Sequence, residues 1–541
     1  MKVKSMVQSL FLPTCTLTAF PGHALALPTV TVSDGVLVGT TTTLPSATAS
    51  VNKFLGVPFA AIPTGSLRWA PPAAVPTYTT RQANAWSNSC VQQFIDSPYP
   101  PNRTQTMQLF NNPAPVESED CLYLNVYVPS SGATGKAVMF WIHGGGLVYG
   151  TASYPWYDGS SFAAHQDVIV VAANYRTNVF GFPHSGDITD KTKWNIGFLD
   201  QRQALQWVQK NIAAFGGDPT KVTIFGESSG ATSVDRLVTT MGSNTPFRAA
   251  IMQSGTSSVT AGGADTSTTY WDSLVQLSGC EGASPVITCM RGVAATAIKS
   301  TIEKDYNATT PSTPFFAFNP IPDGVTELAS PEASRLAGSI AKVPVLQGTN
   351  AQEGRLFSAP YAVSAPGANV NAIDAAYPVP GAFPDDDTAT AQAWTESVYQ
   401  CPAAVVTSDD AKAGIPAWRY YFNASFANYG SVPGFTNRGV YHTTEIPIVF
   451  GTYPSSGATA QEISLSSYMQ TAWATFAKNP TSGPDPAWPK VGTASGSAYI
   501  GVLGNSGNTF TNLTVIQSTT LDGRCSLFYP IYGNSTTGNT W

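Results

Sequence analysis

The sequence predicts an α/β fold in which helices cover a mostly parallel sheet, and three observations support that prediction. Short apolar runs rich in β-branched and aromatic residues have strand character; they occupy residues 138–142, 168–173, 222–225 and 343–346. Helix-compatible stretches lie between them, and a Gly-x-Ser-x-Gly motif directly follows one of the runs. Alternation of buried strands with helices is typical of layered α/β proteins.

The clearest helix is expected over residues 197–215, where apolar residues recur at helical spacing: Leu199, Leu205, Val208 and Ile212. In layered sheets of this kind, active sites form beyond the carboxyl ends of the strands. We therefore look for functional residues in the segments that follow the strands.

Residues 1–26 have the pattern of a secretory signal peptide. Lys2 and Lys4 precede an apolar run, and the Ala-Leu-Ala sequence at 24–26 offers a cleavage site. An apolar helix retained in the fold is the alternative, but two prolines interrupt the run. The rest of the chain, 27–541, contains no linker or charge block and is predicted to be one large domain.

Composition argues against several partners. The formal charge is −6 and only 11% of the residues are charged, so the surface offers little to neutralise phosphates. Nucleic acid and anionic membranes are therefore not expected to bind. After the signal, no segment approaches the length of uninterrupted apolar sequence that spans a bilayer, so we expect a secreted protein without membrane insertion.

Cysteine usage and sequons agree with export. One of the seven cysteines lies in the signal, and the six that remain are an even number: Cys90, Cys121, Cys280, Cys289, Cys401 and Cys525. Spacing alone leaves their pairing open, and buried free thiols are the alternative. Five Asn-x-Ser/Thr sequons suggest a glycoprotein: Asn102, Asn307, Asn423, Asn512 and Asn534.

The Gly-x-Ser-x-Gly motif places Ser228 on a sharp turn between a strand and a helix. The run 221–225 precedes it and a helix-compatible stretch, 231–241, follows it. The motif also arises by chance, and this context favours the functional interpretation. Glycines flanking a strained turn leave the serine exposed, as a nucleophile requires.

A serine hydroxyl needs a base to accept its proton and a third group to orient that base. His23 lies in the signal and His143 lies in a glycine loop. His165 is expected to cap a surface helix, and His184 follows a proline in a loop. His442 lies in a polar loop late in the chain and fits the order of nucleophile, acid and histidine that α/β-hydrolases use, so we predict it as the base.

The acid is expected at the end of a strand between the serine and the histidine. The strand-like run 343–348 precedes Glu353, which we predict to orient the imidazole. A solvated surface role is the alternative, because carboxylates are mostly exposed. Glu327 is the nearby competitor, but it lies outside a strand-loop context.

Donors for a developing oxyanion are expected in the glycine loop 144–146, which follows the strand at 138–142. Only glycines let backbone N–H groups come close to a substrate carbonyl. In the hydrolase pattern, the residue after the nucleophile, here Ser229, supplies a further N–H. A triple glycine alone is more often a flexible turn; its place beside the serine motif favours an oxyanion hole.

These residues resemble the type-B carboxylesterase and lipase family, which includes cholinesterases and fungal lipases. The match is carried by segments along most of the chain: 53–58, 65–68, 118–127, 174–176, 195–201, 215–219, 225–230, 353–354 and 439–450. The blocks 119–127 and 225–230 are the two family signatures. The resemblance implies an α/β-hydrolase fold, a large central mostly parallel mixed sheet flanked by helices.

The resemblance also implies residue roles. It assigns Ser228, Glu353 and His442 as the catalytic triad and Gly145, Gly146 and Ser229 as the oxyanion hole. It implies ion pairs between Arg68 and Glu119 and between Arg176 and Asp200. It pairs the cysteines as Cys90–Cys121, Cys280–Cys289 and Cys401–Cys525. In lipases of this family, the loop equivalent to 90–121 is a mobile lid.

Two positions depart from the family pattern. Asn111 stands where cholinesterases have a tryptophan that stacks on the substrate ammonium, so a choline ester would lose its cation site. Leu147 stands where many relatives have phenylalanine after the glycines.

The predicted function is a secreted serine hydrolase that cleaves small-molecule or lipid carboxylic esters through an acyl-enzyme, as a type-B carboxylesterase. No cofactor or metal is expected. A triacylglycerol or steryl-ester lipase with a mobile lid is the alternative within this class. A non-catalytic, cholinesterase-like binding protein is a more remote alternative, since relatives of this fold serve in adhesion after losing the serine.

Overall fold

The structure is a computed structural model. It describes residues 27–45, 47, 49–94, 96, 101–257, 267–308, 317–357, 369–428, 438–492, 498–505 and 511–532. The predicted signal peptide, 1–26, and the sequon at Asn534 lie outside the described residues.

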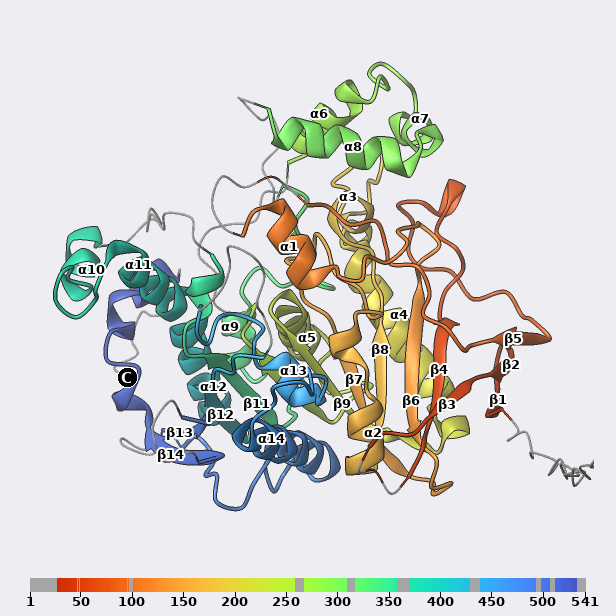
Figure 1. Ribbon diagram of the computed structural model, residues 1–541. Coiled ribbons are helices and arrows are strands. Elements are labelled where there is room, and N and C mark those ends of the chain that lie inside the picture. The colour runs from red at the N-terminus through yellow and green to blue at the C-terminus, as the bar shows by residue number, and fades with distance from the viewer. Residues whose placement is uncertain are drawn as a thin grey trace, which may run out of the picture.

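An 11-stranded mixed sheet forms the centre of the molecule, in the order β14-β13-β12-β11-β10-β9-β7-β8-β6-β4-β3 (Figure 1). From β13 to β8 in this order, neighbouring strands run parallel, and the outer strands at both ends are antiparallel. The strands are β3 Thr40–Thr42, β4 Val51–Pro58, β6 Tyr123–Pro129, β7 Lys136–Ile142, β8 Ile169–Ala173, β9 Gly217–Glu227, β10 Ala249–Gln253, β11 Val345–Asn350, β12 Ala417–Phe422, β13 Tyr499–Leu503 and β14 Leu513–Gln517. A small separate sheet contains β1 Thr29–Val32, β2 Gly35–Val38 and β5 Thr80–Gln82. The predicted fold class is confirmed.

Helices cover both faces and the upper edge of the large sheet, and Figure 1 shows α6, α7 and α8 grouped above it. The helices are α1 Arg103–Phe110, α2 Ser160–Gln166, α3 Asn178–Gly181, α4 Ile196–Asn211, α5 Ser229–Thr240, α6 Thr269–Leu277, α7 Val286–Gly292, α8 Ala295–Tyr306, α9 Pro331–Leu336, α10 Val370–Ala376, α11 Asp386–Trp394, α12 Cys401–Lys412, α13 Ile446–Phe450 and α14 Ala460–Lys478. The helix predicted over 197–215 is α4 followed by a 3₁₀ turn, Ile212–Phe215.

Two hydrophobic cores lie on opposite faces of the sheet, and β7 contributes side chains to both of them. Val138 and Phe140 pack into the core that contains side chains of α4 and α5. Met139 and Trp141 point the other way, into the core that contains side chains of α2 and α14. Because successive strand residues face opposite sides, a continuous apolar run is what a strand buried on both faces requires.

The predicted strands are present with shifted ends. β9 extends further than the run 222–225, since Gly217 also pairs with Lys136 of β7. β11 begins after Pro344, which has no N–H for the sheet ladder, and continues to Asn350. This extension brings the strand end within three residues of Glu353.

Candidate active site

Ser228 occupies the sharp turn between β9 and α5. Its φ of 57° and ψ of −125° lie in a region that non-glycine residues rarely adopt. Its N–H donates to the carbonyl of Gln253 at the end of β10 (2.9 Å). A Cβ on Gly230 would lie 2.1 Å from the carbonyl oxygen of Ile142, so only glycine fits there. The serine stands at the carboxyl end of the sheet, as predicted, but it is half-buried rather than exposed.

His442 and Glu353 are brought into direct contact from distant segments. The imidazole Nδ1 lies 2.6 Å from Glu353 Oε2. The other oxygen, Oε1, accepts from the N–H of Asn350 (2.6 Å) and from the hydroxyl of Ser254 (2.5 Å). Glu353 is fully buried. A carboxylate held this way fixes the tautomer and orientation of the imidazole.

The opposite ring nitrogen points toward the serine turn. His442 Nε2 lies 3.1 Å from Oε1 of Glu227, the residue directly before Ser228. The imidazole therefore contacts both Glu353, which follows β11, and Glu227, the last residue of β9. Sequence reasoning missed Glu227 as a functional side chain; its place inside the Gly-Glu-Ser motif was the available signal.

Glu445 is a third buried acid at this site, and it was also missed. It accepts from the side-chain amides of Asn350 (2.6 Å) and Gln253 (3.0 Å). Gln253 in turn accepts from the indole N–H of Trp473 (3.0 Å). This network ties the ends of β10 and β11 to the segment that carries the histidine.

These acids control the protonation of the imidazole. Burial alone would lower the pKa of His442, but the negative fields of Glu227 and Glu353 outweigh it and raise that pKa. Burial raises the pKa of Glu227 well above its usual value, and burial together with Glu353 raises the pKa of Glu445. The site thus holds a proton on the Glu227–His442 pair more readily than an isolated histidine would.

The glycine loop lies directly against the serine. A Cβ on Gly144 would be 3.0 Å from the Cβ of Ser228. Gly145 and Gly146 have φ values of 104° and 63°, which L side chains rarely adopt. The carbonyl of Gly145 accepts from the amide of Val148 (3.0 Å), which folds the loop into a compact turn. The described contacts leave the N–H groups of Gly145 and Gly146 available as donors.

The other candidate residues are engaged elsewhere. Burial lowers the pKa of His143 to about 4, and its ring stacks on Tyr175 (4.4 Å between centroids). His165 lies in the last turn of α2, and His184 contacts the carbonyl of Asn319. Glu327 forms an ion pair with an arginine of α5.

The chain matches the carboxylesterase family over residues 26–376 and 383–513. The chain belongs to this family. Its relatives include a fumonisin B1 esterase of Sphingopyxis macrogoltabida, 33% identical over 472 residues, covering 81% of each chain. A chlorogenic acid esterase of Aspergillus niger is 31% identical over 444 residues, covering 80% of each. Carboxylesterase 1E of Mus musculus is 33% identical over 536 residues, covering 90% of this chain and 92% of the relative. The chain is accordingly a carboxylic ester hydrolase.

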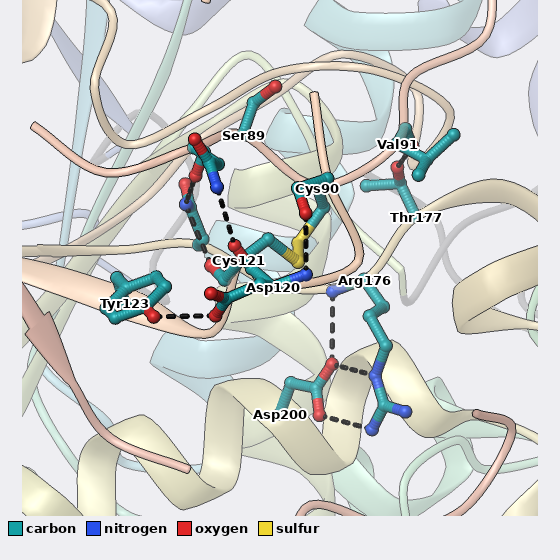
Figure 2. Close-up of a disulfide and its surroundings, with 12 residues drawn as sticks. Ser89, Cys90, Val91, Asp120, Cys121, Tyr123, Arg176, Thr177 and Asp200 are labelled. Atoms are coloured by element: carbon teal, nitrogen blue, oxygen red, sulfur yellow. Dashed lines mark hydrogen bonds and ion pairs between the residues drawn. A yellow bond between two sulfur atoms is a disulfide. The ribbon is translucent and has the colours of Figure 1, made fainter. Parts of the chain in front are cut away.

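The six cysteines of this carboxylesterase form three disulfides, and their pairing is the one that the family resemblance implies: Cys90–Cys121, Cys280–Cys289 and Cys401–Cys525. Figure 2 shows the first disulfide beside the ion pair of Arg176 with Asp200 (2.7 Å). Arg68 donates from two nitrogens to Glu119 (2.6 and 2.5 Å). These contacts hold the base of the disulfide loop.

The disulfide loop 90–121 is fastened to α8 by charged side chains. Arg103 of α1 pairs with Glu303 (3.2 Å), and Lys299 pairs with Glu117 (2.6 Å). Glu303 also accepts from the amide of Phe94 (3.3 Å). We call these contacts the α8 clasp.

The inner side of α1 packs on the two segments that carry the acid and the histidine. Leu109 forms a buried cluster with Leu356 and Tyr441. The hydroxyl of Tyr154 donates to the carbonyl of Leu109 (2.5 Å). The described part of the disulfide loop thus packs against the segments that carry Glu353 and His442.

Asn111, which the family resemblance aligns with a tryptophan of cholinesterases, is buried near the end of the loop. Its Oδ1 accepts from the side-chain amide of Gln92 (2.9 Å), whose Oε1 accepts from the amide of Gly150 (2.7 Å). The amide side chain of Asn111 has no aromatic ring, so it cannot bind a quaternary ammonium through a cation–π contact.

Four sequons lie in the described part of the chain. Asn102 caps α1, Asn307 hydrogen-bonds with Asp96, and Asn512 does so with Ser464; Asn423 is half-buried. Their glycosylation stays a prediction. Over the described residues, no helix has the length and apolar character to cross a membrane, and no cluster of three or more His, Cys, Asp or Glu could hold a metal ion.

Proposed function

We propose that this chain hydrolyses carboxylic esters through an acyl-enzyme formed on Ser228. The observation that carries the proposal is the orientation of His442. Its Nδ1 is anchored on Glu353 (2.6 Å), while its Nε2 faces the turn that presents Ser228. A nucleophile on a strained turn, a base, and an acid that orients the base are the parts that acyl transfer requires.

In the proposed cycle, Ser228 attacks the ester carbonyl while His442 takes its proton, and Glu353 stabilises the imidazolium. The N–H groups of Gly145, Gly146 and Ser229 stabilise the oxyanion of the tetrahedral intermediate. His442 then returns the proton to the leaving alcohol. Water, activated by the same imidazole, releases the acid and regenerates the serine.

Ser228→Ala is the direct test. We expect the variant to lose hydrolysis of p-nitrophenyl butyrate and labelling by a fluorophosphonate probe, while the wild type is labelled at Ser228. Full activity of the variant would contradict the proposal. Absence of labelling in the wild type would favour the non-catalytic binding protein.

A lipase remains the second candidate, and the packing of α1 is the observation that favours it. Leu109 and Phe110 of α1 pack on Leu356 and Tyr441, next to the acid and the histidine, and movement of α1 would uncover these apolar residues. We prefer a general esterase, because the α8 clasp and the disulfide restrain the loop. A sharp rise of activity on emulsified long-chain triglycerides, compared with soluble short-chain esters, would overturn that preference.

Secretion is proposed from the N-terminal pattern together with the disulfides, which form and persist in oxidising compartments. N-terminal sequencing of protein recovered from the medium is expected to begin at Leu27. Recovery of unprocessed protein only inside the cell would contradict this.

A further inference from the structure

Aromatic rings pack beside the buried imidazole of His442. The ring centroid of Tyr399 lies 4.8 Å from that of His442, and the centroid of Phe357 lies 5.5 Å from it. Phe357 stacks on Trp394 (5.2 Å, 18° between planes) and lies nearly parallel to Tyr399 (6.4 Å, 13°). We call Phe357, Trp394 and Tyr399 the histidine wall.

A π-helical turn, Thr395–Gln400, presents Tyr399 to the site. Such turns are rare and occur frequently at functional sites. Hydrogen bonds hold this turn in place, because Glu396 within it accepts from Arg524 (2.9 Å) and from the hydroxyl of Tyr377 (2.7 Å). Tyr399 is half-buried, and its ring is held in place beside the imidazole of His442.

A second group of rings lies on the side of the glycine loop. Tyr149, which follows that loop, stacks on Phe94 (5.1 Å, 22°) and on Phe110 (6.1 Å, 22°). Tyr149 and Phe110 are half-exposed, whereas Phe94 is buried behind them. We call these three residues the loop wall.

Each wall contains a ring that lies beside a residue of the proposed catalytic machinery. A Cβ on Gly145 would lie 2.9 Å from a ring carbon of Tyr149, and the ring centroid of Tyr399 lies 4.8 Å from that of His442. Phe110 of the loop wall and Phe357 of the histidine wall pack against one cluster, which contains Leu109. Burial raises the pKa of both Tyr149 and Tyr399, so both phenols stay neutral beside the site.

We propose that Tyr149 and Tyr399 make this site selective for esters that carry a flat aromatic ring next to the ester bond. The proposal rests on the hydrolytic function of Ser228. An aromatic ring gains stacked and edge contacts with these faces that a saturated ring of similar size cannot make. The loop wall lies beside the proposed oxyanion donors and the histidine wall lies beside the proposed base.

Matched ester pairs test the proposal with the wild-type protein. Methyl 3-phenylpropanoate is compared with methyl 3-cyclohexylpropanoate, and benzyl acetate with cyclohexylmethyl acetate, so that the ring lies in the acyl or in the alcohol part. We expect kcat/KM to be about fivefold or more higher for the aromatic member of at least one pair, the size of one or two aromatic contacts. Equal rates, or faster cleavage of the saturated members in both pairs, would overturn the proposal.

Variants then assign the preference to residues. Tyr399→Leu and Tyr149→Leu are expected to bring the aromatic-to-saturated ratio of kcat/KM close to one, while Tyr399→Phe keeps most of it because the ring face remains. Tyr468→Leu, which removes a half-exposed tyrosine of α14 that bonds to Asp485, is the matched control and should keep the wild-type ratio. A wild-type ratio in both leucine variants would contradict the assignment.

Loss of the aromatic selectivity and loss of the hydrolytic function give different results in these experiments. If the wild type cleaves ethyl butyrate and is labelled at Ser228 but shows no aromatic preference, only the selectivity is wrong. If it cleaves no ester and takes no label, the hydrolytic function itself is wrong.

Discussion

His442 Nε2 lies 3.1 Å from Glu227 Oε1, so the proposed base touches the residue that directly precedes Ser228. With Nδ1 held 2.6 Å from Glu353, the imidazole sits between two buried carboxyl groups. The second contact places a carboxyl group beside the ring nitrogen that accepts the proton of Ser228 in the proposed cycle. The pH dependence of activity is therefore expected to reflect His442, Glu227 and Glu353 together, and not the histidine alone.

Glu227→Gln is expected to shift the acid side of the pH profile. His442 accepts a proton only when neutral, so activity falls as the pH drops through its pKa. Burial opposes the raised pKa of His442, and Glu227 is the leading group that raises it. Removing that charge should therefore lower the apparent pKa of kcat/KM by about one unit. An unchanged profile would contradict this, and Glu281→Gln, at an exposed position, should leave the profile unaltered.

Glu353→Gln tests the orienting acid. The amide retains the shape but cannot accept at both oxygens, so the hydrogen bonds from Asn350 and Ser254 compete with that from His442. We expect kcat to fall about 10³- to 10⁴-fold, as when an orienting aspartate is replaced by its amide. Thermal melting shows whether the variant is folded. A folded variant with kcat within tenfold of the wild type would remove Glu353 from the mechanism.

Much of this site followed from the sequence, because its main parts have local signals. The strand before Ser228 is a β-branched run, Glu353 follows another such run, and few histidines compete with His442. Glu445 and the Tyr399 ring had no such signal. Their roles depend on contacts with side chains far away in the chain, which neither periodicity nor spacing encodes.

The cysteines show the same limit. Cys401 and Cys525 lie 124 residues apart, and no local pattern joins them. Their pairing was implied by a family resemblance, and the packing of α12 against the C-terminal segment supplies the physical reason for it.

Gly145→Ala is expected to damage the oxyanion hole. A Cβ on Gly145 would lie 2.2 Å from the carbonyl oxygen of Tyr149, and the φ of 104° disfavours any side chain. The loop must move, and loss of one donor lowers kcat about 10²- to 10³-fold. Gly132→Ala is the matched control, since Gly132 also has a positive φ (69°) but no neighbour within 4 Å of a Cβ. Equal kcat values for the two variants would contradict a catalytic role of the loop.

Glu303→Gln is expected to loosen the disulfide loop at the α8 clasp. Glu303 accepts from Arg103 and from the amide of Phe94, and Lys299 lies 3.9 Å away. The pairs are partly exposed, so each contributes at most about 1 kcal/mol. Loss of the charge should speed amide hydrogen exchange in α1 by up to about fivefold, with exchange in α4 unchanged. The same acceleration is expected in the wild type at high salt, because salt screens partly exposed pairs. Unchanged exchange in α1 under both conditions would show that Leu109 and the disulfide alone keep the loop closed.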